Sequence, residues 1–178
     1  MSHKYYICYT LKKRLKDCTQ VVHIGKIMEN TEIERKFLIK EGAFDYSSFP
    51  YHELEQGYLN VKPAIRVRKE DDTYYMTYKG KGVIAHTEYN LPLTKEAYEH
   101  LLSKADGNII RKRRYLIPYE KYTIELDVFE EPFAPLILAE VEFDTKEEAE
   151  NFVVPGWFEK DVTANPEYHN SNMSCRIF

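Results

Sequence analysis

The sequence predicts a mainly β domain of the α+β class, with about eight strands in mostly antiparallel order. Two observations predict it. Side-chain character alternates with a period of two in most segments after residue 30, as it does in strands. The 178 residues also include 15 Tyr and 9 Phe but 7 Gly, which favours strands over glycine-loop nucleotide folds. A chain of this length corresponds to one domain.

The expected strands follow one another closely, and helices are expected after the fifth and the eighth. The strands cover residues 32–40, 53–61, 64–69, 73–79, 84–93, 108–118, 122–129 and 136–144. Thr94 can cap a helix that ends at Leu102, because its side-chain oxygen accepts a hydrogen bond from a free N–H group of the first turn. Asp144 or Thr145 can cap a second helix that ends at Phe152.

The two ends of the chain differ from this pattern. Residues 1–29 contain a basic stretch over 12–16 without a clear period, and a second methionine, Met28, precedes the first patterned segment. We therefore expect residues 1–29 to be an extension outside the core and residues 30–178 to form the domain. A strand or helix added to the core is the alternative for the extension. The tail from Trp157 onward is expected to be irregular to helical.

Composition and charge exclude several classes of protein. Hydrophobic residues make up 43% and charged residues 30%, and no apolar run approaches the roughly 20 residues of a membrane-spanning helix. The net charge of -4 argues against nucleic acid as a partner but leaves room for a small anion. Cys8, Cys18 and Cys175 lack metal-ligand spacing, and no secretory signal is evident, so we expect free thiols in a cytoplasmic protein.

Charge, rather than apolarity, repeats with a period of two on several expected strands. Side chains two residues apart share one face of a strand. The charged faces are Glu32/Glu34/Lys36, Arg66/Arg68, Lys112/Arg114, Glu125/Asp127 and Glu140/Glu142, with Lys79 and Glu88 on the strands between. The opposite faces are apolar. One reading is an ordinary sheet with its charged face in water. The other places a metal between the carboxylates and an anion between the basic groups, which would relieve the repulsion of like charges.

Several motifs resemble the CYTH superfamily, the triphosphate tunnel metalloenzymes. Residues 31–38 read Thr-Glu-Ile-Glu-Arg-Lys-Phe-Leu, with the Glu-x-Glu-x-Lys signature of the opening strand of that family. The match continues in order through residues 55–59, 65–68, 76–79, 87–89, 111–115, 125–129 and 139–143, and the tail resembles the short bacterial members, which are inorganic triphosphatase-like. The resemblance implies an eight-stranded antiparallel β-barrel with a charged interior and a few helices packed outside.

The resemblance also implies roles for the charged residues. It implies metal ligands at Glu32, Glu34, Asp127, Glu140 and Glu142. It implies phosphate-binding residues at Lys36, Arg66, Arg68, Lys79, Lys112 and Arg114. Glu88 and Glu125 are expected to support these groups. Because all the expected ligands are oxygen atoms, the metal is expected to be Mg²⁺ or Mn²⁺, with two ions in the site.

The implied activity is metal-dependent hydrolysis of inorganic triphosphate to pyrophosphate and phosphate. Glu140 is expected to orient the attacking water, and Tyr58 matches a tyrosine that works with a lysine matching Lys79 in the thiamine triphosphatase branch. A class IV-like adenylate cyclase, a thiamine triphosphatase and a non-catalytic polyphosphate-binding module are the alternatives. Ala64 stands where many members carry Glu, and His169, where related members often carry Lys, is expected to be a solvated residue. A monomer and a homodimer both remain open.

Overall fold

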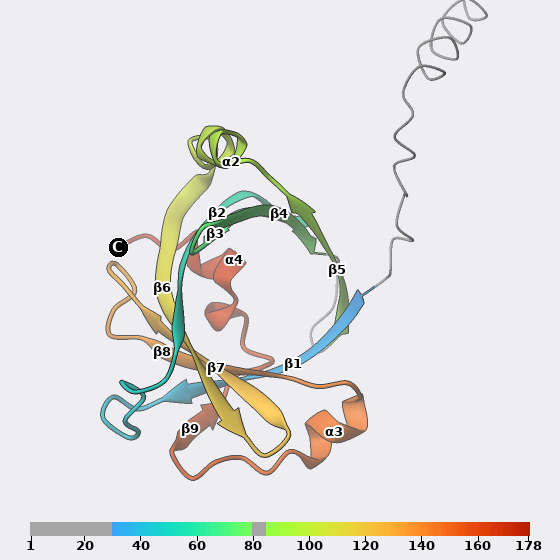
Figure 1. Ribbon diagram of the computed structural model, residues 1–178, viewed down its shortest axis with the longest axis vertical. Helices are drawn as coiled ribbons and strands as arrows, with labels where there is room; N and C mark the ends of the chain where they lie inside the picture. Colours follow the sequence, from blue (N-terminus) through green and yellow to red (C-terminus); the bar gives the residue numbers. More distant parts are fainter. Residues whose placement is uncertain (1–29, 80–84) are drawn as a thin grey trace, which may run out of the picture.

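The computed structural model describes residues 30–79 and 85–178, so the extension expected over residues 1–29 lies outside the described part of the chain. The predicted fold class is confirmed: the protein is mainly β, with one sheet of nine strands (Figure 1). The strands are β1 (Asn30–Ile39), β2 (Tyr51–Val61), β3 (Ala64–Glu70), β4 (Thr73–Lys79), β5 (Ala85–Pro92), β6 (Asp106–Tyr119), β7 (Tyr122–Phe129), β8 (Ile137–Glu142) and β9 (Phe158–Asp161).

The strands pair in the order β5-β4-β3-β2-β6-β7-β8-β1-β9, and all pairings are antiparallel. β1 also pairs with β5, residues 30–33 with residues 85–88. The eight strands β1 to β8, in the spatial order given above, therefore surround the interior of the barrel that Figure 1 shows end-on. β9 pairs with β1 outside this series.

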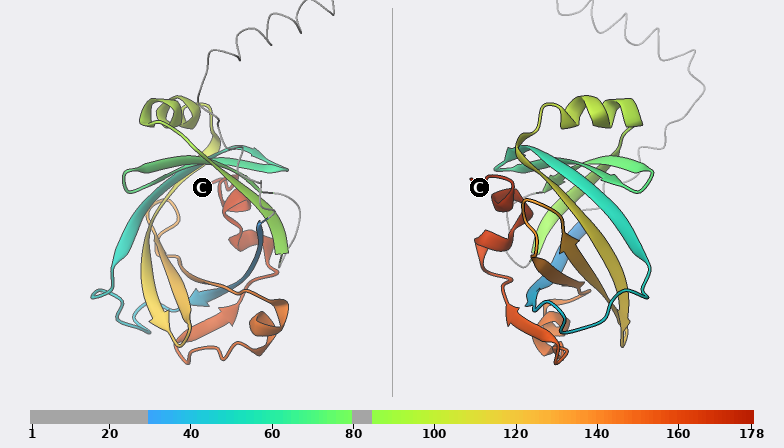
Figure 2. Two further views of the ribbon diagram at one scale, coloured as in Figure 1. Left: turned by 45° about the vertical axis from the view of Figure 1, so that its right-hand side comes forward. Right: turned by 90° about the vertical axis from the view of Figure 1, so that its left-hand side faces the viewer.

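The two helices expected after the fifth and eighth strands are confirmed, and each begins at a threonine cap. Helix α2 (Lys95–Leu102) follows Thr94, whose side chain accepts a hydrogen bond from the Ala97 N–H. Helix α3 (Lys146–Asn151) follows Thr145, which accepts from the Glu148 N–H. Helix α2 packs on β2, β3 and β4, and α3 packs on β1, so the helices cover the outside of the barrel on different sides (Figure 2).

The tail contains more structure than the sequence pattern indicates. It forms β9, a 3₁₀ turn η1 (Pro166–Tyr168) and helix α4 (Asn170–Met173). β9 is a strand that the sequence does not predict, because four residues reading Phe-Glu-Lys-Asp are too short to show a period. Its pairing with β1 supplies the strand structure. No helix in the described ranges is long and apolar enough to span a membrane.

The apolar residues form two clusters on opposite sides of the barrel wall. The outer cluster lies under α3 and includes Phe37, Leu126 and Val141. The inner cluster includes Ile110, Phe129, Leu138 and Met173. Its strand residues share faces with the charged residues, since they lie two positions from Lys112, Asp127 and Glu140. The barrel interior therefore has an apolar part, which α4 joins through Met173, and a charged part.

The start of β6 holds the C-terminal segment. Gly107 has a φ of 72°, and a Cβ atom there would lie 2.2 Å from the backbone oxygen of Ser174. The Asn108 N–H donates to the same oxygen at 2.7 Å, and the Asn108 amide donates to the Arg176 carbonyl at 2.7 Å. The close backbone approach at Gly107 thus brings the end of α4 against β6.

We expect Gly107→Ala to destabilise the protein more than Gly42→Ala. Both glycines have positive φ, which costs an L residue roughly 1–2 kcal/mol, but a Cβ at Gly42 meets nothing within 4 Å. Only Gly107→Ala must also displace the Ser174 backbone. Urea denaturation of both variants measures the difference in the free energy of unfolding. Equal losses would contradict this packing of the C-terminal segment.

Candidate active site

A cavity of about 1020 Å³ lies inside the barrel, and its wall contains most of the residues predicted to form the site. Ten of them line it: Glu34, Lys36, Tyr58, Arg66, Arg68, Lys79, Glu88, Arg114, Glu140 and Glu142. Lys112, Glu125 and Asp127 do not line it, and the side chain of Glu32 is outside the described part of the structure. Residues 166 and 169–172 of the tail also line the cavity.

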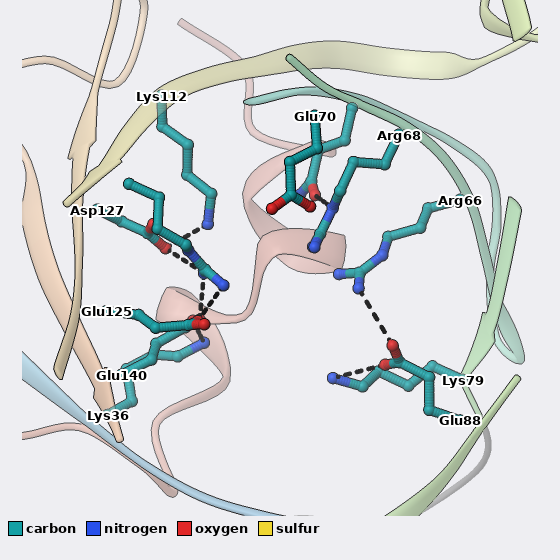
Figure 3. Close-up of polar contacts among 12 residues, drawn as sticks. Lys36, Arg66, Arg68, Glu70, Lys79, Glu88, Lys112, Glu125, Asp127 and Glu140 are labelled. Atoms are coloured by element: carbon teal, nitrogen blue, oxygen red, sulfur yellow. Dashed lines mark hydrogen bonds and ion pairs between the residues drawn. The ribbon is translucent and has the colours of Figure 1, made fainter. Parts of the chain in front are cut away.

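Strand register places residues of opposite charge next to each other in this wall. Lys36 of β1 pairs with Glu140 of β8, and Arg114 of β6 pairs with Asp127 of β7. Because side chains two residues apart lie on the same face of a strand, further charged residues of these strands also lie on the inner face of the barrel. Figure 3 shows the result as two groups of charged side chains that face each other across the interior.

The first group, the Arg114 cluster, comprises Lys36, Lys112, Arg114, Glu125, Asp127 and Glu140 (Figure 3). Arg114 is at its centre. Its Nε and Nη2 donate to the two oxygens of Asp127 at 2.7 Å each, and Nη2 also donates to Glu140 at 2.6 Å. Nη1 donates to Glu125. Lys36 Nζ lies 2.6 Å from the other Glu140 oxygen.

These contacts shift the pKa values of the cluster. Burial alone would raise the pKa of Glu140, but Lys36 and Arg114 hold it well below its usual range. Burial opposes the charge of Lys36 as well, and Glu140 and Glu34 nevertheless raise its pKa. Glu125 differs, because burial outweighs Arg114 and raises the pKa of this carboxyl. Glu140 is therefore a carboxylate at neutral pH that acts as a hydrogen-bond acceptor.

Asp127 and Lys112 lie behind the cavity wall. Asp127 is 0% exposed, and both of its oxygens accept hydrogen bonds from Arg114, with Lys112 sharing one of them. Lys112 is 1% exposed, and burial together with Arg114 lowers its pKa to about 8. Both were predicted to contact ligands directly; in the structure Asp127 accepts hydrogen bonds from Arg114, and Lys112 contacts Asp127.

The second group, the Arg66 cluster, comprises Arg66, Lys79 and Glu88. Glu88 lies 3.7 Å from Arg66 Nη2 and 3.2 Å from Lys79 Nζ, as drawn in Figure 3. The Asn90 amide donates to Glu88 at 3.1 Å, and Thr77 donates its hydroxyl proton to the Asn90 oxygen at 2.6 Å. Burial alone would lower the pKa of Arg66, but Tyr58 and Glu88 raise it. Glu88 thus lies within ion-pair distance of two cations of the wall.

Sequence reasoning missed the neutral polar residues of the site. Thr77 and Asn90 lie two positions from Lys79 and Glu88, so the same period of two already placed them on the inner face. His169 was expected to be a solvated residue. His169 is half-buried and lines the cavity, with Nε2 3.3 Å from the Thr163 carbonyl oxygen.

Two of the carboxylates that line the cavity are placed where they could hold a divalent ion together. Glu34 and Glu142 are register partners on β1 and β8, and both line the cavity. Directly opposed carboxylates repel each other unless a cation lies between them. In proteins, Mg²⁺ is usually bound by one or two carboxylates, and substrate phosphates and water molecules supply its remaining ligands. Among the side chains that the structure describes, which do not include that of Glu32, no three Asp, Glu, His or Cys groups form a ready metal site without such additional ligands.

An antiparallel barrel with two clusters of buried charge around its cavity defines a class of protein that holds a small, highly charged ligand inside the barrel. The family model described as the CYTH domain matches residues 30–169. The chain belongs to the CYTH family.

Similar proteins agree with this assignment. An inorganic triphosphatase of Nitrosomonas europaea is 34% identical over 152 residues, which cover 83% of this chain and 99% of the relative. An inorganic triphosphatase of Acetivibrio thermocellus is 35% identical over 147 residues, covering 80% of this chain and 92% of the relative. A crystal structure of an inorganic triphosphatase superimposes with a TM-score of 0.64 at 33% identity, covering 82% of this chain and 95% of that chain.

Proposed function

We propose that the protein hydrolyses inorganic triphosphate to pyrophosphate and phosphate inside the barrel, with Mg²⁺ or Mn²⁺. The observation that carries the proposal is the composition of the cavity wall, which contains both buried cations and a pair of opposed carboxylates. Cations alone would bind a polyphosphate, and the Glu34–Glu142 pair adds a place for a divalent ion. The two relatives named inorganic triphosphatase support this choice of substrate.

The basic residues of the wall are proposed to hold the phosphate oxygens. Arg66, Arg68 and Arg114 present planar guanidinium groups, which bind phosphate through two hydrogen bonds at once. Lys36 and Lys79 add compact charges on neighbouring strands. Lys112 is proposed to act through Asp127, which holds Arg114, since Lys112 does not line the cavity.

Glu34 and Glu142 are proposed to hold the divalent ion. When bound, such an ion neutralises charge on the leaving phosphate and lowers the pKa of a coordinated water. The wider ligand set implied by the family also includes Glu32, Asp127 and Glu140, and it would serve two ions. For Asp127 and Glu140 to join it, they would have to exchange hydrogen bonds from Arg114 for the ion.

Glu140 and Tyr58 are proposed to act on the water and the substrate. The low pKa of Glu140 makes it a weak base, so its part is to accept a hydrogen bond from the attacking water and thereby orient it. Tyr58 lines the cavity. It is the register partner of Arg66 and therefore lies beside the Arg66 cluster. There it can contact the same phosphate group as Arg66 and Lys79.

The alternatives are less well supported. An adenylate cyclase or a thiamine triphosphatase would use the same phosphate-binding wall, and the relatives that cover most of the chain are named inorganic triphosphatases. A non-catalytic polyphosphate-binding module would gain nothing from the opposed carboxylates Glu34 and Glu142. We further propose that the partner is a small molecule rather than nucleic acid, and that the protein acts in the cytoplasm.

Inorganic triphosphate should release phosphate faster than ATP or thiamine triphosphate, because the charged wall recognises phosphate groups alone. A chelator should abolish the release, and Mg²⁺ or Mn²⁺ should restore it. The measurement is phosphate release from each of the three substrates with each ion. Cyclic AMP as the main product from ATP, with inorganic triphosphate untouched, would favour the cyclase. Undiminished turnover after exhaustive chelation would refute the metal proposal.

A further inference from the structure

Arg68 differs from the other basic residues of the site in its partners. The other basic residues of the site each form an ion pair with a carboxylate; they are Lys36, Arg66, Lys79, Lys112 and Arg114. Arg68 lines the cavity and is 8% exposed, but within the described ranges no carboxylate lies within 4.0 Å of its guanidinium. Its hydrogen bonds go to neutral atoms, from Nε to Gln56 Oε1 at 3.1 Å and from Nη1 to the Tyr75 hydroxyl at 3.2 Å.

The strand register builds this arrangement. Arg68 on β3 pairs with Gln56 on β2 and with Tyr75 on β4, so one neutral acceptor lies on each side of it. A guanidinium has five N–H groups. Two of them are used by Gln56 and Tyr75, and three remain for an anion. Figure 3 shows the Arg68 side chain extending from β3 toward the middle of the barrel, as Arg66 does.

Glu70 sets the direction of the Tyr75 hydroxyl. The hydroxyl donates its proton to Glu70 Oε2 at 2.6 Å, and its oxygen is thereby left to accept from Arg68. Burial raises the pKa of Tyr75, so the phenol stays neutral. Glu70 is thus linked to Arg68 through a neutral hydroxyl group and not by a direct ion pair within 4.0 Å in the described part of the chain.

Burial of the Gln56 side-chain amide lowers the stability of the fold unless its carbonyl oxygen makes a required contact. It is 0% exposed, and within the described part of the chain its Nε2 atom has no hydrogen-bond partner. An apolar side chain of similar size would avoid this buried, unpaired donor. The contact that the amide does make is the one to Arg68, which it holds without adding a negative charge.

We infer that Gln56 and Tyr75 are positioning residues that hold Arg68 through neutral atoms and so keep it as an uncompensated cation for a phosphate group. The inference rests on the proposed function, because it takes a triphosphate as the ligand of the cavity. It predicts that the two neutral contacts matter for anion affinity only while Arg68 is present.

The test is a double-mutant cycle read by calorimetric titration of inorganic triphosphate, with turnover measured in parallel. Tyr75→Phe and Gln56→Met should each weaken binding by about 3- to 10-fold, the effect of losing one ordinary hydrogen bond, because each loss acts on the anion only through the position of Arg68. KM should rise more than kcat falls. In an Arg68→Ala background, neither change should alter the affinity further. Tyr74→Phe is the matched control, since Tyr74 lies next to Tyr75 and its ring packs against Tyr98, whereas the Tyr75 hydroxyl is the one that contacts Arg68.

Gln56→Glu separates charge from geometry. A carboxylate there would hold Arg68 at least as firmly but neutralise it, so triphosphate affinity should fall although the contact is kept. Affinity equal to or above that of the unaltered protein would overturn the inference. Equal losses in the presence and absence of Arg68 would overturn it too. If Gln56→Met fails to fold, Tyr75→Phe completes the cycle.

The outcomes also separate this inference from the proposed function. If the unaltered protein binds triphosphate without hydrolysing it, the proposed function fails and the binding cycle still decides the inference. If it hydrolyses triphosphate but the cycle shows no coupling, the inference alone fails. An unaltered protein that does not bind triphosphate overturns both.

Discussion

Arg114→Met should lower the free energy of unfolding by about 3–5 kcal/mol and abolish turnover, the largest effect expected of any single substitution in the site. Arg114 donates to Asp127, Glu125 and Glu140, and it is 8% exposed. Removing it leaves three carboxylates close together with Lys36 and Lys112 as the remaining cations. Unpaired buried charge is costly because water cannot solvate it. Urea denaturation at neutral pH measures the loss.

Arg113→Met is the matched control for this substitution. Arg113 lies next to Arg114 on β6 but faces outward, with a side chain that is 50% exposed and 3.9 Å from Glu53. A surface ion pair of this kind contributes about 0–1 kcal/mol. A similar loss of stability in both variants would show that Arg114 is not the centre of a buried network.

The dependence on pH provides a second check of the Arg114 cluster. In the unaltered protein the folded-state pKa of Glu140 is lowered, so its contribution to stability is present at neutral pH and is lost as the pH falls through the acid range. In Arg114→Met, Glu125 loses its ion pair and lies close to two other carboxylates, so its pKa should lie above the unfolded-state value, and protonation then relieves repulsion as the pH falls. The difference in stability between the two proteins should therefore narrow toward acid pH. A constant difference would contradict the electrostatic origin of the effect.

Much of the fold was predictable because its signals are local. The period of two gave strands β1 to β8 with ends within a few residues of those observed, since alternation depends on neighbouring side chains alone. The caps at Thr94 and Thr145 were predictable for the same reason. β9 was not predictable, because its strand structure comes from pairing with a distant segment, β1.

The sequence predicts which side chains lie on the inner face of the strands. It does not predict which of them reach the cavity and which are buried behind its wall. Asp127 and Glu140 occur in similar acidic strand patterns, yet Asp127 lies behind Arg114 and Glu140 reaches the cavity. This difference depends on which cationic side chains cover which carboxylates. The alternation of charged and apolar residues along a strand contains no information about these contacts. The neutral residues Gln56 and Tyr75 were overlooked because the charged pattern defined the faces, although both lie on them.

Arg68→Ala and Glu142→Ala should separate anion binding from metal binding. Arg68→Ala should weaken triphosphate binding by roughly 10- to 100-fold, the effect of losing one charged hydrogen-bonding group, at 1.5–3 kcal/mol. Mn²⁺ binding without substrate should change little or become tighter, because a nearby positive charge has been removed. Glu142→Ala should do the reverse. It removes half of the opposed pair with Glu34, so Mn²⁺ affinity should fall by at least about 10- to 100-fold, the range for losing a group that supports a metal ligand.

The measurement is titration of Mn²⁺ into each metal-free variant, followed by titration of triphosphate. Glu147→Ala is the matched control for Glu142→Ala, because it removes the same charge from an exposed position on α3, outside the barrel. It should leave both affinities unchanged. Turnover of Glu142→Ala should recover in part as Mn²⁺ is raised, since the defect lies in occupancy of the ion, whereas that of Arg68→Ala should recover as triphosphate is raised. If Arg68→Ala abolishes Mn²⁺ binding while Glu142→Ala spares it, the roles of the two residues are the opposite of those proposed, and the barrel would bind its anion through the strands assigned here to the metal.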